Sequence, residues 1–241
     1  MEHLAQRLAA IPGVVAVALG GSRATGTARP DSDWDFGLYY RGSLDPDDVR
    51  ALGWPGQVFG PGQWGRIVDG GAWLRVDGVR VDLIYRDLDV VLAATAEAEA
   101  GRFEIHREVG YVAGIATYVL TGELALGKVL SGQLPRPAFP EALRQAAPAV
   151  WSHLAAGAAV CAEGHLRRGD QVAGLANLTQ AVLAGAQARL ASEGQWALNE
   201  KGIVERAGLG FLQEAIRADP MAAVEAVRRA LALPDWGPAA G

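Results

Sequence analysis

The chain has 241 residues, of which 50% are hydrophobic and 20% charged, so it can bury the core of one large domain or of two smaller ones. Its 31 glycines are scattered among apolar segments, and this composition excludes a disordered chain. The formal charge of −5 at pH 7 leaves no basic face in the sequence, which argues against nucleic acid as a partner.

The cellular location is predicted from what the sequence lacks. Cys161 is the single cysteine, so no disulfide forms within the chain, and its helical, apolar surroundings predict a buried thiol. Glu2 and Pro12 interrupt the pattern of a targeting segment, and no apolar run approaches the roughly 20 residues that span a bilayer. We therefore expect a cytoplasmic protein with no membrane partner, and we make no prediction of its oligomeric state.

The first part of the chain alternates helices with strands. The periodicity of its apolar residues predicts a helix over residues 2–11, strands over 14–19, 33–40, 73–76 and 79–85, and a turn or short helix over 23–26. Asp77-Gly78 separates the last two strands and is a strong hairpin signal, because both residues tolerate positive φ. The segment 53–71 is rich in Gly, Pro and Trp and is predicted to be a long loop.

The second part is predicted to be helical. From about Leu88 the apolar residues have helical spacing, and beyond residues 135–140 nearly the whole chain to Leu233 fits a helix. The fold class is therefore α/β (α+β), with two domains. Residues 1–135 would form a mixed β-sheet flanked by helices, and residues 136–241 would form a helical bundle.

Two aspartates stand two residues apart on the predicted strand over 33–40. Side chains at i and i+2 share one face of a strand, so Asp33 and Asp35 converge. Two carboxylates held together repel unless one is protonated or a cation bridges them, and their hard oxygens suit Mg²⁺. Asp82, on another predicted strand, could join them. Three such groups can hold two metal ions about 3.5–4 Å apart, an arrangement that serves phosphoryl displacement.

A glycine turn precedes the aspartate pair. Ser22 follows Gly20-Gly21 and would begin a short helix, so its hydroxyl and the nearby N–H groups could hold phosphate oxygens. The glycine spacing of a P-loop is present, but its Lys and Ser/Thr are missing after Gly26. The aspartates from Asp31 onward lack the glycine and glutamate of a calcium loop. The sequence thus predicts chemistry on a nucleoside triphosphate.

The combined pattern resembles that of the DNA polymerase beta-type nucleotidyltransferase superfamily. It consists of Gly21-Ser22, a spacer, Ser32-Asp33-Trp34-Asp35, and hydrophobic-Asp-hydrophobic at Val81-Asp82-Leu83. The resemblance covers residues 14–86, and the helical half that follows is similar in kind to that of antibiotic (aminoglycoside) nucleotidyltransferases.

The resemblance implies a nucleotide-binding set and a metal-binding set. The nucleotide-binding residues would be Gly21, Ser22, Arg23, Ser32 and Lys201. The catalytic residues, which are also the ligands of Mg²⁺ or Mn²⁺, would be Asp33, Asp35 and Asp82. Asp82 would also act as the base. Arg23 has a second interpretation as a solvated arginine, and Lys201 has one as an exposed first-turn residue of a helix capped by Asn199.

We therefore expect an enzyme, a metal-dependent nucleotidyltransferase. It would move AMP from ATP, or the monophosphate of another nucleoside triphosphate, onto a hydroxyl of a small molecule such as an aminoglycoside-type antibiotic, and release pyrophosphate. Two alternatives stay open: a protein adenylyltransferase of regulatory or antitoxin type, and a non-catalytic nucleotide-binding module. Trp54, Trp64 and Trp73 lie near the predicted site and could stack on a base or sugar, although core packing is the favoured interpretation.

Overall fold

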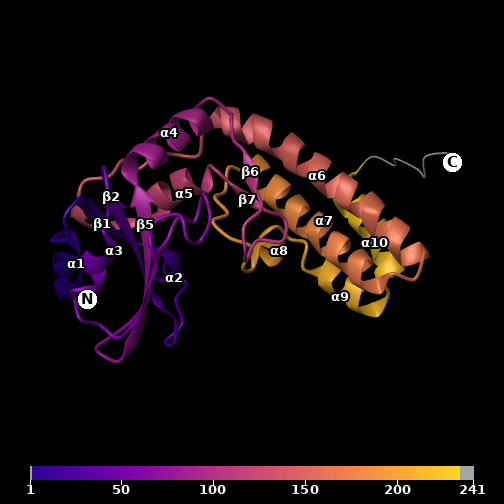
Figure 1. The fold of residues 1–241 in the computed structure, drawn as a ribbon. Coiled ribbons are helices and arrows are strands. Elements are labelled where there is room, and N and C mark those ends of the chain that lie inside the picture. The colour runs from indigo at the N-terminus through magenta and orange to yellow at the C-terminus, as the bar shows by residue number, and fades with distance from the viewer. Residues whose placement is uncertain (1, 234–241) are drawn as a thin grey trace. The chain divides into compact units, whose positions relative to one another are not determined.

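The computed structural model describes residues 2–233, which form two compact units (Figure 1). The first unit contains the described residues up to Ala98 together with Phe103–Val109 and Ala116–Ala138. The second contains the other described residues, mainly those from Phe139 onward. A sheet with helices in the first unit and a helical second unit confirm the predicted α/β class.

The first unit is built on a six-stranded mixed sheet. Its strands are β1 Val14–Leu19, β2 Trp34–Tyr40, β3 Gly56–Val58, β4 Gly71–Val76, β5 Val79–Asp87 and β8 Lys128–Gly132. They lie in the order β3-β4-β5-β2-β1-β8. β2 and β5 run parallel, and the other neighbours run antiparallel. The two parallel strands therefore lie at the centre of the sheet.

Five helices accompany this sheet in the described part of the first unit. They are α1 Glu2–Ala9, α2 Gly21–Thr25, α3 Pro46–Arg50, α4 Leu88–Glu99 and α5 Val119–Leu126. Leu4 and Leu8 of α1 are one helical turn apart, and both are fully buried. They join a core on one sheet face, whose strand members include Phe36, Leu38, Val81, Leu83 and Tyr85. Short strands β6 Ile105–His106 and β7 Ile115–Ala116 pair separately.

The predicted elements of the first part are present, and four strands, β3, β6, β7 and β8, were not predicted. The helix and the four predicted strands appear as α1, β1, β2, β4 and β5. The Asp77-Gly78 turn is confirmed, with φ values of 52° and 81°. The predicted long loop over 53–71 is partly wrong because it contains β3. β8 was not predicted, since all its residues except Ser131 are exposed and no apolar alternation marks it.

The second unit is helical. Its helices are α6 Glu141–Arg167, α7 Gln171–Ser192, α8 Ile203–Arg206, α9 Phe211–Ala218 and α10 Pro220–Ala230. Small residues line the contact between the long helices, where a side chain at Gly174 would lie 2.6 Å from Leu166. Cys161 is exposed on α6, so the prediction of a buried thiol was wrong. The small residues around it made its helix face look apolar without covering it.

Within residues 2–233, no helix has both the length and the hydropathy that a membrane crossing requires.

Candidate active site

The alignment of β2 with β5 brings two predicted site residues side by side. The parallel register pairs Asp35 with Asp82. Both side chains alternate with the core residues of their strands, so they lie on the sheet face away from the core. Asp33 directly precedes β2, which begins at Trp34. Asp33 is therefore close in the chain to the Asp35–Asp82 pair, near the start of β2.

A glycine at the start of helix α2 allows the helix to pack against one of these carboxylates. The N–H of Gly20 donates to the carbonyl of Asp35 at 2.8 Å. Gly21 has φ +58°, and a Cβ at this position would lie 1.9 Å from Oδ2 of Asp35. Glycine is needed here for both its backbone conformation and its lack of a side chain. The turn that sequence reasoning linked to phosphate thus lies in contact with the aspartate pair.

An arginine forms an ion pair with one of these three carboxylates. Nε of Arg80 lies 2.6 Å from Oδ1 of Asp33, and the side chain of Arg80 is 60% exposed. The same oxygen is buried and accepts no hydrogen bond, so the contact is an ion pair. Arg80 also donates to the carbonyl of Asp31 at 3.3 Å. Arg80 stands two residues from Asp82 and hence on the same strand face.

The proximity of the carboxylates changes the protonation of Asp82. Burial raises its pKa, and the negative charges of Asp35 and Asp33 raise it further, while Arg80 lowers it. The result is a pKa of about 6 in place of 3.8. A proton or a cation at this point would relieve the repulsion.

Asp82→Asn should stabilise the metal-free protein. The folded pKa of Asp82 exceeds its unfolded pKa, so the folded state binds the proton more tightly and loses stability as pH rises from about 4 to 6. Asparagine removes this cost. Because Asp82 is only partly buried, we discount the shift and expect a gain of about 1 kcal/mol at pH 7 that vanishes near pH 4. Urea unfolding in EDTA at both pH values measures it; equal gains at both would contradict the electrostatic cause.

Arg23 and Ser32 hold the segment that precedes β2. Arg23 donates to the carbonyls of Ser32 at 2.6 Å and Asp33 at 3.1 Å. Its guanidinium lies 4.3 Å from the ring centre of Trp34. The hydroxyl of Ser32 accepts the N–H of Arg29 at 2.9 Å. Both residues thus position Asp33, and the guanidinium of Arg23 has partners within the protein.

The remaining predicted nucleotide contacts lie in different units. Ser22 is half-buried in α2, next to Gly21. Lys201 is exposed in the second unit, and its N–H donates to Oδ1 of Asn199 at 2.9 Å. That bond closes a turn, since the cap of α8 is Gly202. The prediction that Asn199 caps a helix is therefore wrong.

An aromatic cluster lies beside Asp82 on the same sheet face. The antiparallel register pairs Trp73 of β4 with Asp82 of β5. Trp73 is stacked on Trp64, with 5.2 Å between ring centres, and meets Phe59 edge-on at 5.0 Å. Its exposed fraction is 51%, so core packing was the wrong interpretation for Trp73. Trp54, in contrast, packs against the core, as predicted.

The three carboxylates have the right chemistry for a hard divalent cation. Carboxylate oxygens are the ligands that Mg²⁺ and Mn²⁺ prefer. The buried Oδ1 of Asp33 without a hydrogen bond, and the raised pKa of Asp82, both indicate a need for positive charge. Among residues 2–233, no three His, Cys, Asp or Glu side chains lie close enough together to form a ligand set as they stand. The donor types fit a divalent cation, and Arg80 now supplies part of the charge.

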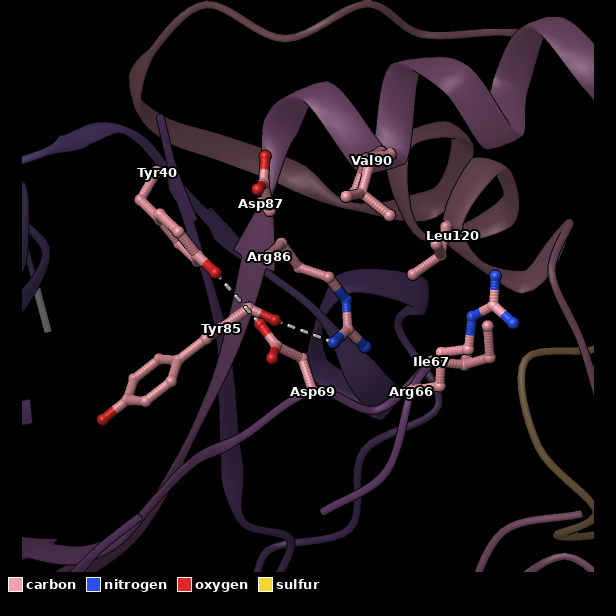
Figure 2. A pocket seen from close by; sticks show the side chains of 10 residues that line it. Tyr40, Arg66, Ile67, Asp69, Tyr85, Arg86, Asp87, Val90 and Leu120 are labelled. Carbon is pink, nitrogen blue, oxygen red and sulfur yellow. Dashed lines mark hydrogen bonds between the residues drawn. The ribbon is translucent and has the colours of Figure 1, made fainter. Parts of the chain in front are cut away.

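A second polar region lies at the other end of β5, around a pocket of about 180 Å³ (Figure 2). Arg86 is 4% exposed and forms two hydrogen bonds to the carboxylate of Glu123 on α5, of which Nη2 to Oε1 is 2.7 Å. Its Nη1 donates to the carbonyls of Val68 and Tyr85, each at 2.9 Å. Burial lowers the pKa of Arg86, but Glu123 and other neighbours outweigh it and raise the pKa overall. These paired groups tie β5 to α5.

Comparison with known proteins finds a family that is similar to the first part of the chain. Residues 1–103 match the family model described as the nucleotidyltransferase domain. This segment is therefore similar to the nucleotidyltransferase domain, which confirms the resemblance noted in the sequence at the level of the domain. It supports a transferase activity that uses a nucleoside triphosphate.

One solved structure, a nucleotidyltransferase-like protein from Exiguobacterium sibiricum 255-15, is similar over 95% of this chain and 72% of its own. Its sequence identity is 12% and its TM-score 0.45. No curated protein matches the chain.

Proposed function

We propose that the protein transfers a nucleoside monophosphate from a nucleoside triphosphate, ATP in the first instance, to a hydroxyl of a small molecule and releases pyrophosphate. The observation that carries this proposal is the pairing of Asp35 with Asp82, in contact with Gly21, within a nucleotidyltransferase domain. The enzyme would depend on Mg²⁺ or Mn²⁺.

The residues around Gly21 would bind the triphosphate. Gly21 has no side chain to keep phosphate oxygens away from the backbone, and Ser22 adds a hydroxyl at the same turn. Arg23 and Ser32 would keep Asp33 in place by holding its backbone. Lys201 would be a further contact of the phosphates, in keeping with the family resemblance.

Asp33, Asp35 and Asp82 would hold the divalent cation. When bound, the cation supplies positive charge against the triphosphate and the departing pyrophosphate. Arg80 would give up its contact with Asp33 as that charge arrives, since one carboxylate oxygen cannot serve both at the same distance. The side chain of Arg80 is exposed enough to swing into solvent.

Asp82 is the best placed group for proton transfer. The acceptor oxygen forms a bond to the α-phosphorus, the bond from that phosphorus to the β-bridging oxygen breaks, and pyrophosphate leaves with the electron pair. The carboxylate of Asp82 takes the proton of the hydroxyl. The parallel register holds Asp82 next to Asp35, which contacts the turn at Gly21, so this carboxylate lies within the group that would meet the phosphates.

Thermal unfolding of the full chain with each of the four nucleoside triphosphates, with and without Mg²⁺, tests the proposal. A ligand at about 100 times its Kd stabilises the folded state by about 2.7 kcal/mol, which corresponds to an increase in Tm of several degrees. We expect this increase to require both the nucleotide and Mg²⁺ in the wild type, and to be lost in Asp33→Asn.

Asp31→Asn is the matched control, because it removes the same charge two residues away on an exposed side chain. It should keep the increase. No increase with any nucleotide would count against the proposal, as would an equal increase in Asp33→Asn. Label from α-labelled ATP on a protein band would point to a protein acceptor, and stabilisation without any turnover would point to a binding module.

A further inference from the structure

We propose that Trp73 and Arg75 of β4 form the binding surface for the acceptor, and that this surface takes a planar ring carrying an anionic group, as in a nucleotide. The inference rests on the proposed function and adds to it the chemical class of the acceptor.

The order of the strands separates the two substrates. Gly21 follows β1, Asp35 lies on β2, Asp82 on β5 and Trp73 on β4, and these strands are consecutive neighbours in the sheet. The triphosphate would lie at Gly21, on one side of Asp82. Trp73 lies directly across from Asp82 on its other side. A molecule that presents a hydroxyl to Asp82 from the side opposite the phosphates therefore rests on Trp73.

Trp73 is held in place by its neighbours. The ring of Trp64 packs beside it, in space that exists because Gly71 has no side chain; a Cβ there would lie 2.6 Å from that ring. Phe59 supports Trp73 from a second direction. About half of Trp73 stays open to solvent. A large, pre-positioned ring with an open surface is suited to stacking on a planar ligand. Stacking of this kind has little preference for one base over another.

The charge next to Trp73 is positive. Arg75 and Arg80 stand directly opposite each other on β4 and β5, an arrangement that costs stability unless an anion lies between them. Arg80 is paired with Asp33. Arg75 donates to the carbonyl of Gly78 at 3.3 Å, and it makes no ion pair with any residue in the range 2–233. Its free charge, two residues from Trp73, favours an anionic acceptor over a cationic antibiotic.

Equilibrium dialysis of the full chain against labelled adenosine 5′-monophosphate tests the inference. The nucleotide site is first filled, in the presence of Mg²⁺, with an ATP analogue in which a methylene group replaces the oxygen between the α- and β-phosphates. Wild-type protein should then bind one labelled monophosphate per chain. Trp73→Leu and Arg75→Gln should each weaken this binding at least about tenfold and leave the affinity for the analogue unchanged.

Two further variants act as controls. Trp73→Phe keeps a stacking ring and should retain most of the binding. Arg66→Gln removes the same charge from another exposed side chain and should change nothing. Adenosine, which lacks the phosphate, should bind wild-type protein about tenfold more weakly than the monophosphate and should bind Arg75→Gln with the same affinity as wild type.

Three results would overturn the inference. Wild-type protein could bind no monophosphate once the nucleotide site is filled, or Trp73→Leu could bind the monophosphate as tightly as wild type. The third is a tenfold lower affinity of Trp73→Leu for the ATP analogue. The last would place Trp73 against the base of the triphosphate. The proposed function fails by a separate result, namely that the analogue does not bind wild-type protein or binds Asp33→Asn equally well.

Discussion

Asparagine at Asp35 should reduce nucleotidyl transfer at least about a hundredfold, which corresponds to a loss of about 2.7 kcal/mol of transition-state stabilisation. The substitution keeps the size of the side chain and removes its charge, so the contact with Gly21 can persist while a divalent cation loses a ligand. Asp35 lies between the glycine turn and Asp82, so no other carboxylate can replace it. Transfer of label from α-labelled ATP to a set of hydroxylated small molecules, nucleotides included, measures the effect.

Asp77→Asn is the control for this loss. It removes one carboxylate from the same unit, and Asn-Gly suits the β4–β5 turn as well as Asp-Gly does. Its activity should equal that of the wild type. A folded Asp35→Asn protein that keeps more than about a hundredth of wild-type activity would exclude the proposed chemistry.

Glu123→Ala should lower the free energy of unfolding by about 3 kcal/mol, because it leaves the guanidinium of Arg86 buried without its counter-ion. We expect the low end of the usual 3–5 kcal/mol range, since the Glu123 side chain is 23% exposed and water can reach the vacated space. The two residues join β5 to α5, so the loss affects the whole first unit. Urea unfolding, monitored by circular dichroism, measures it.

The double substitution Arg86→Met with Glu123→Leu separates charge from packing. It removes both ions and fills similar volume, so it should regain most of the lost stability. A double variant no more stable than Glu123→Ala would show that packing, and not the unpaired charge, dominates. A cost below about 1 kcal/mol for Glu123→Ala would contradict the importance of the ion pair.

The fold of the first part was predictable where apolar periodicity and turn residues agreed. Each of the strands β1, β2, β4 and β5 is either a continuous apolar run or a segment in which apolar and polar residues alternate. The Asp77-Gly78 pair between the last two allows only a tight turn. β3 and β8 escaped prediction because edge strands that bury little carry no such pattern. Their pairing depends on β4 and β1 already being in place. The boundary near residues 135–136 stays a prediction.

The residues of the candidate site could be predicted from the sequence, but their contacts with one another could be predicted only in part. The spacing of Asp33 and Asp35 and the apolar neighbours of Asp82 placed each carboxylate on a strand face, but the pairing of two strands far apart in the sequence is set by tertiary structure. The roles of these residues stay predictions. The exposure of Trp73 could also have been predicted. Trp73 and Arg75 alternate along β4 with the apolar residues Ala72, Leu74 and Val76, which is the pattern of an exposed strand face.

The alignment of β2 with β5 sets two properties of the protein at once. Pairing runs without interruption from Trp34 with Val81 to Tyr40 with Asp87. Because side chains alternate between the faces of a strand, a slip of one residue would turn Asp82 into the core and Leu83 out to water. The free energy of burying leucine, valine and tyrosine therefore selects the alignment in which the carboxylates meet. A misaligned sheet cannot persist as a stable but inactive form, and errors at the site are removed by the folding of the core.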